Sequence, residues 1–173
     1  TLYDPMYIED SWIGNSFQGY LPIFPKLNES IDKYYPETKL ALTEYNFGGG
    51  NHISGAIAEA DALGVFASNG VYVSNLWAIN SDFSYQLSAI DLYTNYDRNG
   101  SCFGDTLVTA STSDITKGTA YASIHGADES KLNMILTNKS LTDVQNSIIN
   151  IDSGAEYTSA KIYGITGNSS EIQ

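Results

Sequence analysis

The stretch Lys39-Leu40-Ala41-Leu42-Thr43-Glu44-Tyr45 decides the fold class of the first part of the chain. It is a short apolar run just before Gly48-Gly49-Gly50, which is typical of a strand buried on both faces of a parallel sheet. A second run of the same kind covers Val71 to Trp77. Three segments with apolar residues at three- and four-residue steps predict helices: Leu21 to Tyr35, His52 to Ser68 and Tyr85 to Tyr93.

This alternation of helices and strands predicts parallel strands joined by crossover helices. Two parallel strands alone leave both edges of the sheet open. We therefore expect residues 1–97 to be the last strands and helices of a larger α/β domain, most simply a (β/α)8 TIM barrel. Thr1 to Tyr20 carries aromatic residues without a clean period, and it predicts a long loop.

The pattern changes after Gly100 to short runs in which apolar and polar residues alternate. Turn clusters such as Gly126-Ala127-Asp128 separate these runs. The pattern predicts an antiparallel β-sandwich over residues 98–173, and we expect this sandwich to be incomplete. The predicted strands are Leu107 to Ala110, Ala120 to Ile124, Leu132 to Asn138, Val144 to Ile151 and Ala160 to Ile165.

Composition narrows the classes of partner. The 173 residues include 20 acidic and 8 basic side chains, a formal net charge of −12. Such a chain repels phosphate backbones, so we expect no nucleic-acid partner. Apolar stretches such as Ala62 to Ala67 are far too short to cross a bilayer, so we expect no membrane partner. The single cysteine, Cys102, excludes an internal disulfide, and neutral polysaccharides remain possible partners.

Parallel-barrel enzymes place catalytic groups at the carboxyl ends of their strands, and Glu44 has that position. Glycosidases need two carboxyl groups, roughly 5–5.5 Å apart when the mechanism is retaining. Glu44 is therefore a candidate nucleophile or acid/base, and the alternative is an exposed glutamate at a strand end. Tyr45 is a candidate partner that holds this carboxylate by a hydrogen bond, and we also expect it to be a substrate-binding residue.

Two tryptophans are candidate platforms for sugar rings. Trp77 ends the second predicted strand, where an indole face packs well on the C–H face of a sugar, and the alternative is a core residue. Trp12 precedes the first predicted helix, and the alternative is a side chain that holds a loop down. His52 stands at the start of a predicted helix, where a capping role is the stronger interpretation.

The sequence lacks the motifs of several classes of functional site. The sequence has no His-x-x-x-His, no phosphate-binding Gly-x-Gly-x-x-Gly and no Gly-x-Ser-x-Gly. Asp97, Asp105 and Asp114 do not have the spacing of an EF-hand loop. We therefore expect neither a metal site nor a cofactor.

The residues together resemble glycoside hydrolase family 44. The resemblance runs over nearly the whole chain and fades toward Gln173. Its motifs are Thr1-Leu-Tyr-Asp-Pro5, Glu9-Asp-Ser-Trp-Ile-Gly14, Ile31-Asp-Lys-Tyr-Tyr-Pro36, Leu40-Ala-Leu-Thr-Glu-Tyr-Asn-Phe-Gly-Gly49, Asn51-His-Ile-Ser-Gly55, Phe103-Gly-Asp105 and Thr112-Ser-Asp114.

The resemblance implies a retaining endo-β-1,4-glucanase with a TIM barrel and a β-sandwich, which acts on cellulose-type chains and in many members on xylan, xyloglucan or mixed-linkage glucan. Since polymeric glucans do not enter cells, we expect the protein to be secreted. The resemblance also implies that Glu44 is the nucleophile at the end of barrel strand seven, that Trp77 ends strand eight, and that Trp12 lies along the substrate cleft.

The chain departs from the family pattern in length and in one motif. It has about a third of the family's length, and the Asn-Glu-Pro run that carries the family's acid/base is absent from it. We expect that glutamate upstream of Thr1, in a missing N-terminal portion, and little activity from this chain alone. A different class of function, a non-catalytic carbohydrate-binding β-sandwich module, stays open as an alternative.

Overall fold

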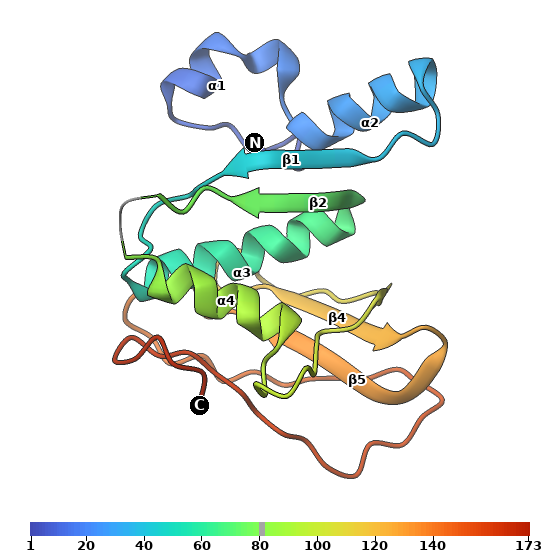
Figure 1. The fold of residues 1–173 in the computed structure, drawn as a ribbon, viewed down its shortest axis with the longest axis vertical. Helices are drawn as coiled ribbons and strands as arrows, with labels where there is room; N and C mark the ends of the chain where they lie inside the picture. Colours follow the sequence, from blue (N-terminus) through green and yellow to red (C-terminus); the bar gives the residue numbers. More distant parts are fainter. Residues whose placement is uncertain (80–81) are drawn as a thin grey trace. The chain divides into compact units, whose positions relative to one another are not determined.

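The computed structural model describes residues 1–79 and 82–173. Contacts between residues divide the chain into two compact units, which we call unit 1 (Thr1–Tyr45 and Val65–Trp77) and unit 2 (Asn46–Gly64 and Ala78–Gln173). Figure 1 shows the helices and strands along the chain and labels all of them except η1 and β3. They are α1 (Trp12–Ser16), the 3-10 helix η1 (Gln18–Tyr20), α2 (Ile23–Tyr34), β1 (Leu40–Tyr45), α3 (Ile53–Ser68), β2 (Val71–Leu76), α4 (Ser84–Thr94), β3 (Thr106–Val108), β4 (Ala120–His125) and β5 (Asp128–Leu136).

The predicted helix and strand alternation is present. β1 and β2 pair in parallel, and β3, β4 and β5 form an antiparallel sheet in that order. Pro25 stands in the first turn of α2, where a missing backbone N–H costs nothing. Gly70 ends α3 with φ of 72°, a left-handed conformation that glycine adopts without strain. The chain therefore combines helices with a parallel and an antiparallel sheet, while the domain boundary at residue 97 stays a prediction.

Three predicted features are wrong in detail. Residues 1–20 are not a long loop throughout, because Ser11 caps the short helix α1 and η1 follows it. β1 and β2 contain no fully buried residue, so in the described structure they are not buried on both faces. The runs at 144–151 and 160–165 form no strand, because no described strand lies beside them to complete a ladder.

Unit 1 is built around Phe24 of α2, whose side chain is completely buried. Its ring meets Phe66 of α3 edge-on, at 5.8 Å between centroids. Phe66 also meets Tyr45 at the end of β1, at 5.1 Å and nearly perpendicular. Edge-to-face rings at these distances attract each other, so this cluster fixes the end of β1 against a helix.

Unit 2 has a core of small and aromatic side chains between α3, α4 and the antiparallel sheet. Its buried members are Ala56, Ala60, Ala89, Phe103 and Ile135. Tyr93 of α4 packs on Phe103 at 4.9 Å, and its hydroxyl donates a hydrogen bond of 2.8 Å to the Ala60 carbonyl. Burial raises the Tyr93 pKa above its ordinary value, so this hydroxyl stays a neutral donor.

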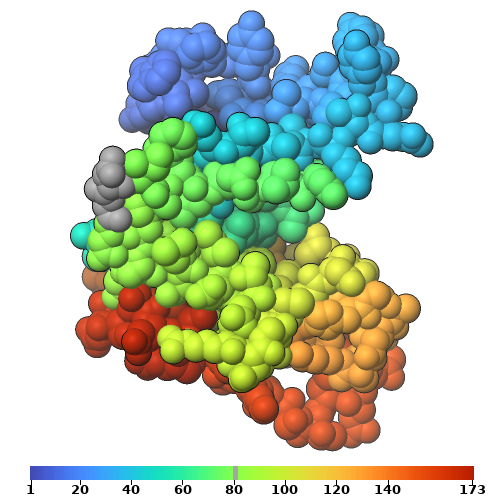
Figure 2. All heavy atoms as spheres, in the orientation of Figure 1, coloured from blue at the N-terminus to red at the C-terminus, as the bar shows by residue number. Residues whose placement is uncertain are grey.

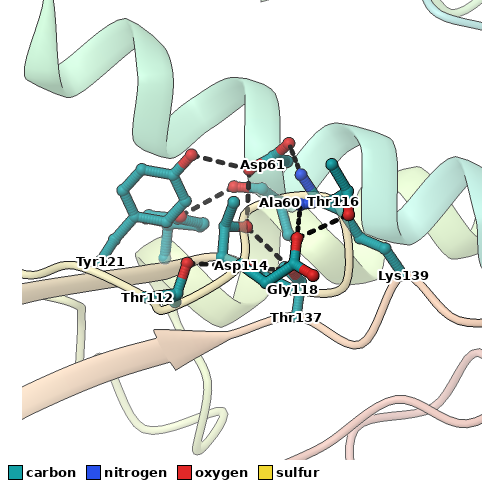
Figure 3. A network of polar contacts seen from close by, with 11 residues as sticks. Ala60, Asp61, Thr112, Asp114, Thr116, Gly118, Tyr121, Thr137 and Lys139 are labelled. Carbon is teal, nitrogen blue, oxygen red and sulfur yellow. Dashed lines mark hydrogen bonds and ion pairs between the residues drawn. The ribbon is translucent and has the colours of Figure 1, made fainter.

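A polar network around Asp61 joins α3 to the sheet of unit 2 (Figure 3). One carboxylate oxygen accepts hydrogen bonds of 2.7 Å from the hydroxyls of Thr119 and Tyr121, and the other accepts one of 2.6 Å from Lys139 Nζ. The hydroxyls of Thr119 and Thr137 lie 2.7 Å apart. Since the Thr119 proton goes to Asp61, Thr137 is the donor in that contact. Sequence patterns give no sign of this network.

The segment after β5 carries exposed apolar side chains. Leu141, Val144 and Ile148 are exposed over most of their surface. Figure 2 shows this orange-red segment projecting at the lower edge, with a gap between its atoms. Among the described helices, none has the length and apolar character that crossing a membrane requires.

Candidate active site

The pairing of β1 with β2 brings two of the predicted site residues to one end of a sheet. Glu44 is the next-to-last residue of β1, and Trp77 directly follows β2. The Trp77 backbone N–H donates a hydrogen bond of 2.8 Å to the Tyr45 carbonyl, which continues the ladder past the end of β2. Because the strands are parallel, both residues lie at their carboxyl ends, where α/β proteins place ligand sites.

A shift in strand register changes where Glu44 faces. Leu42 pairs with Ser74 and Tyr45 with Leu76, so Thr43 and Glu44 together oppose the single residue between them. In a regular strand Glu44 would share a face with Leu42, because side chains alternate. Here Leu42 and Tyr45 are half-buried, whereas Thr43 and Glu44 are both exposed. The extra residue therefore presents the Glu44 carboxylate to solvent, as such bulges often do beside active sites.

The other predicted site residues have distinct surroundings. The Tyr45 ring packs on Phe66, so its place is fixed by apolar contact, and its role toward Glu44 stays a prediction. The Trp77 side chain is 46% exposed. Trp12 is 69% exposed on α1, a separate element that lies toward the arrowheads of β1 and β2 (Figure 1). Both indoles are therefore accessible to a ligand on unit 1.

His52 caps a helix, as the sequence predicted. Its ring nitrogen Nδ1 accepts a hydrogen bond of 3.2 Å from the backbone N–H of Ser54, in the first turn of α3. The loop that leads to this cap is held by α4, because the Tyr85 N–H donates 2.9 Å to the Gly50 carbonyl. Gln86 of α4 is completely buried, and its Nε2 donates to Asn46 Oδ1 at 3.5 Å. Sequence reasoning missed Gln86, whose only signal is a polar residue on an apolar helix.

The three aspartates that lack EF-hand spacing each close a local turn. Asp97 accepts hydrogen bonds from Ser101 and from the Asn99 N–H, Asp105 accepts one from the Gly126 N–H, and Asp114 accepts two from Thr116. These bonds lower the pKa of each carboxyl group, chiefly through Ser101, Gly126 and Thr116 respectively. Within residues 1–79 and 82–173, no group of three or more His, Cys, Asp or Glu side chains has the arrangement of a metal site.

Comparison with known proteins identifies relatives along the whole chain. The chain is 48% identical to a family 44 endoglucanase from Clostridium acetobutylium whose structure is known, and the TM-score between the two is 0.91. The match covers 100% of this chain and 34% of that one. The chain is similar over its whole length to members of glycoside hydrolase family 44. A Paenibacillus polymyxa family 44 xyloglucanase, solved with xyloglucan, is 43% identical with a TM-score of 0.89 and the same coverage.

The curated relatives of this chain are longer proteins. Endoglucanase A of Paenibacillus lautus is 46% identical over 99% of this chain and 25% of its own length. The beta-mannanase/endoglucanase A of Caldicellulosiruptor saccharolyticus is 45% identical over 100% of this chain and 14% of its own length. The chain thus spans a quarter or less of these relatives. No family model matches the sequence.

Proposed function

We propose that the protein containing this chain is a retaining endo-β-1,4-glucanase with Glu44 as its nucleophile. The observation that carries the proposal is the exposed Glu44 carboxylate at the carboxyl end of β1, beside Trp77 at the end of the parallel neighbour β2. The names of the relatives, which are endoglucanases and a xyloglucanase, support the same class of reaction.

The fold that accompanies this proposal is a TIM barrel followed by a β-sandwich. β1 and β2 would be two of the barrel strands, and β3, β4 and β5 would belong to the sandwich, with the boundary at residues 97 and 98. The parallel pairing supports the barrel, because an isolated two-stranded sheet is marginally stable. Tyr72 and Val73 of β2 are exposed, and neighbouring elements of a larger domain would cover such apolar side chains.

The proposed mechanism is double displacement. Glu44 attacks the anomeric carbon, the glycosidic bond breaks, and a covalent glycosyl-enzyme forms. A second carboxylic acid protonates the leaving oxygen and, as a carboxylate, then takes a proton from the water that releases the sugar. We infer that this group lies outside the 173 residues. General acid assistance is worth about 10²–10⁴ in rate, so the chain by itself should turn over little substrate.

The proposed substrate is an uncharged β-glucan, with xylan, xyloglucan and mixed-linkage glucan as further candidates. Trp77 and Trp12 would stack on sugar rings, and Tyr45 would line the same site. A neutral polymer suits a chain with a net charge of −12, which would repel an anionic one. Since polymeric glucans do not enter cells, secretion is part of the proposal.

Removal of the Glu44 carboxylate tests the proposal. In the protein that contains this chain, Glu44→Gln should lower kcat on β-glucan by about 10⁴-fold, because the glycosyl-enzyme cannot form. Glu29→Gln on α2 is the matched control, since Glu29 is also exposed in unit 1, and it should retain wild-type turnover. Azide should restore turnover to Glu44→Ala and give a glycosyl azide of inverted configuration. Full activity of Glu44→Gln would refute the assignment.

A further inference from the structure

Three aromatic side chains form a continuous exposed surface on α1 and η1, which we call the ring surface: Trp12, Phe17 and Tyr20. Trp12 and Phe17 meet edge-on at 5.8 Å between centroids, and Phe17 and Tyr20 lie 6.4 Å apart. All three are exposed, Tyr20 by 72% and Phe17 by 43%. Contiguous exposed rings on a rigid support are typical of a binding site, whereas single exposed rings need no explanation.

The backbone holds these rings in place. The Phe17 N–H donates to the Ile13 carbonyl at 2.8 Å, and the Tyr20 N–H donates to the Phe17 carbonyl at 2.9 Å. Consecutive α and 3-10 turns therefore carry the ring surface. A ligand that binds rings already held in position loses less conformational entropy than one that must order a mobile loop.

The start of α1 is also fixed. The Ser11 hydroxyl accepts a hydrogen bond of 3.1 Å from the Ile13 N–H and donates one of 2.5 Å to Glu9. Glu9 also accepts a hydrogen bond from the Thr1 hydroxyl. A Cβ atom at Gly14 would come within 2.2 Å of the Glu9 carbonyl oxygen, so the segment before α1 packs directly on the helix. Both ends of the ring surface thus rest on defined contacts.

The polar groups around the rings fit an uncharged, hydroxyl-rich ligand. Asn15, Ser16 and Gln18 are exposed between the rings, and their amides and hydroxyl both donate and accept hydrogen bonds. Asn15 and Ser16 are three and four residues after Trp12, so they share its face of α1. Residues 1–20 contain three acidic and no basic side chains, which disfavours an anionic ligand.

We propose that Phe17 and Tyr20 extend the sugar-binding surface of Trp12, so that the ring surface binds an uncharged β-glucan chain beyond the sugar at the catalytic carboxylate. This inference rests on the proposed glucanase function. It makes Tyr20 a specificity-determining residue for chain length, because only a substrate long enough to reach η1 gains the contact.

Kinetics on long and short substrates test the inference. Tyr20→Ala should raise KM for soluble β-glucan polymer about 5-fold with kcat unchanged, since a lost ring contact is worth about this factor. KM for a short aryl cello-oligosaccharide should stay at the wild-type value. Tyr20→Phe keeps the ring and should behave as wild type. Tyr35→Ala is the matched control, because Tyr35 is equally exposed at the end of α2.

Binding separates this inference from the proposed function. Affinity electrophoresis of the Glu44→Gln protein in β-glucan gels should show retardation that Tyr20→Ala weakens and Tyr35→Ala leaves unchanged. If the wild type hydrolyses glucan but Tyr20→Ala leaves KM and retardation unaltered, the ring surface binds no glucan and the inference fails alone. A change of sedimentation coefficient on Tyr20→Ala, without a change of KM, would show a protein interface instead. If no form hydrolyses glucan, the proposed function is wrong, and the gels still show whether the ring surface binds glucan.

Discussion

The Asp61–Lys139 ion pair should strongly stabilise the packing of the segment after β5 against α3. Its two side chains are each 25% exposed, and their charged atoms lie 2.6 Å apart. Exposed pairs contribute about 0–1 kcal/mol, whereas breaking a fully buried pair costs about 3–5 kcal/mol. A pair that is three-quarters buried lies between these limits, so we expect Lys139→Met to lower the free energy of unfolding by about 2 kcal/mol.

Hydrogen exchange measures this cost locally. A loss of about 2 kcal/mol should speed the exchange of protected amides in β4 and β5 about 30-fold in Lys139→Met. The matched control is Lys117→Met, because Lys117 lies 3.7 Å from Asp114 in a much more exposed pair. The control should change exchange by less than about 5-fold.

A double-mutant cycle isolates the pair itself. Asp61→Asn and the double variant Asp61→Asn/Lys139→Met complete the cycle with Lys139→Met. The amides of the double variant should exchange more slowly than the sum of the two single effects predicts, because each single change leaves one charge without its partner. The reasoning is refuted if the single effects add, or if Lys139→Met changes exchange no more than Lys117→Met does.

Three further predictions concern single contacts. Gly14→Ala should destabilise α1 and raise KM for glucan polymer, because the added methyl meets the Glu9 carbonyl oxygen, and circular dichroism with kinetics checks this. His52→Ala should cost about 1 kcal/mol in urea unfolding through loss of the α3 cap, while His52→Asn should keep the cap. Burial raises the Asp61 pKa, but hydrogen bonds from Lys139, Thr119 and Tyr121 outweigh it and lower the pKa below 3.8. The carboxyl group is thus a stronger acid in the folded state than in the unfolded state. Its contribution to stability is therefore complete above pH 3.8 and is lost as pH falls through the lowered pKa. In acid titration, the difference in stability between wild type and Asp61→Asn should change with pH only at low pH.

Much of the fold follows from local patterns. The apolar run at Leu40 to Tyr45 and the helical stripe after Gly50 predict β1 and α3 because backbone geometry fixes the period of side chains in each element. α1 was missed because it is five residues long, too short for a period to show. The runs after Asn138 predict strands from alternation alone, but a strand also needs a hydrogen-bonded neighbour, and none of the described residues supplies one there.

The candidate site, too, could be predicted only in part from the sequence. Glu44 and Trp77 can be placed from sequence because each stands at the end of an apolar run. The outward direction of Glu44 could not be predicted, since it depends on a shift between paired strands rather than on either strand alone. Tyr20 had no periodic signal, because its place in the ring surface follows from the turn at η1.

The most direct test of the nucleophile is mass spectrometry of the protein after inactivation with a 2-deoxy-2-fluoro cello-oligosaccharide. The fluorine slows release of the sugar, so the glycosyl-enzyme should accumulate. We predict one sugar adduct per protein, located by peptide fragmentation on Glu44 and absent from Glu44→Gln. An adduct on a different carboxylate, or turnover of glucan with inversion of configuration, would contradict the account.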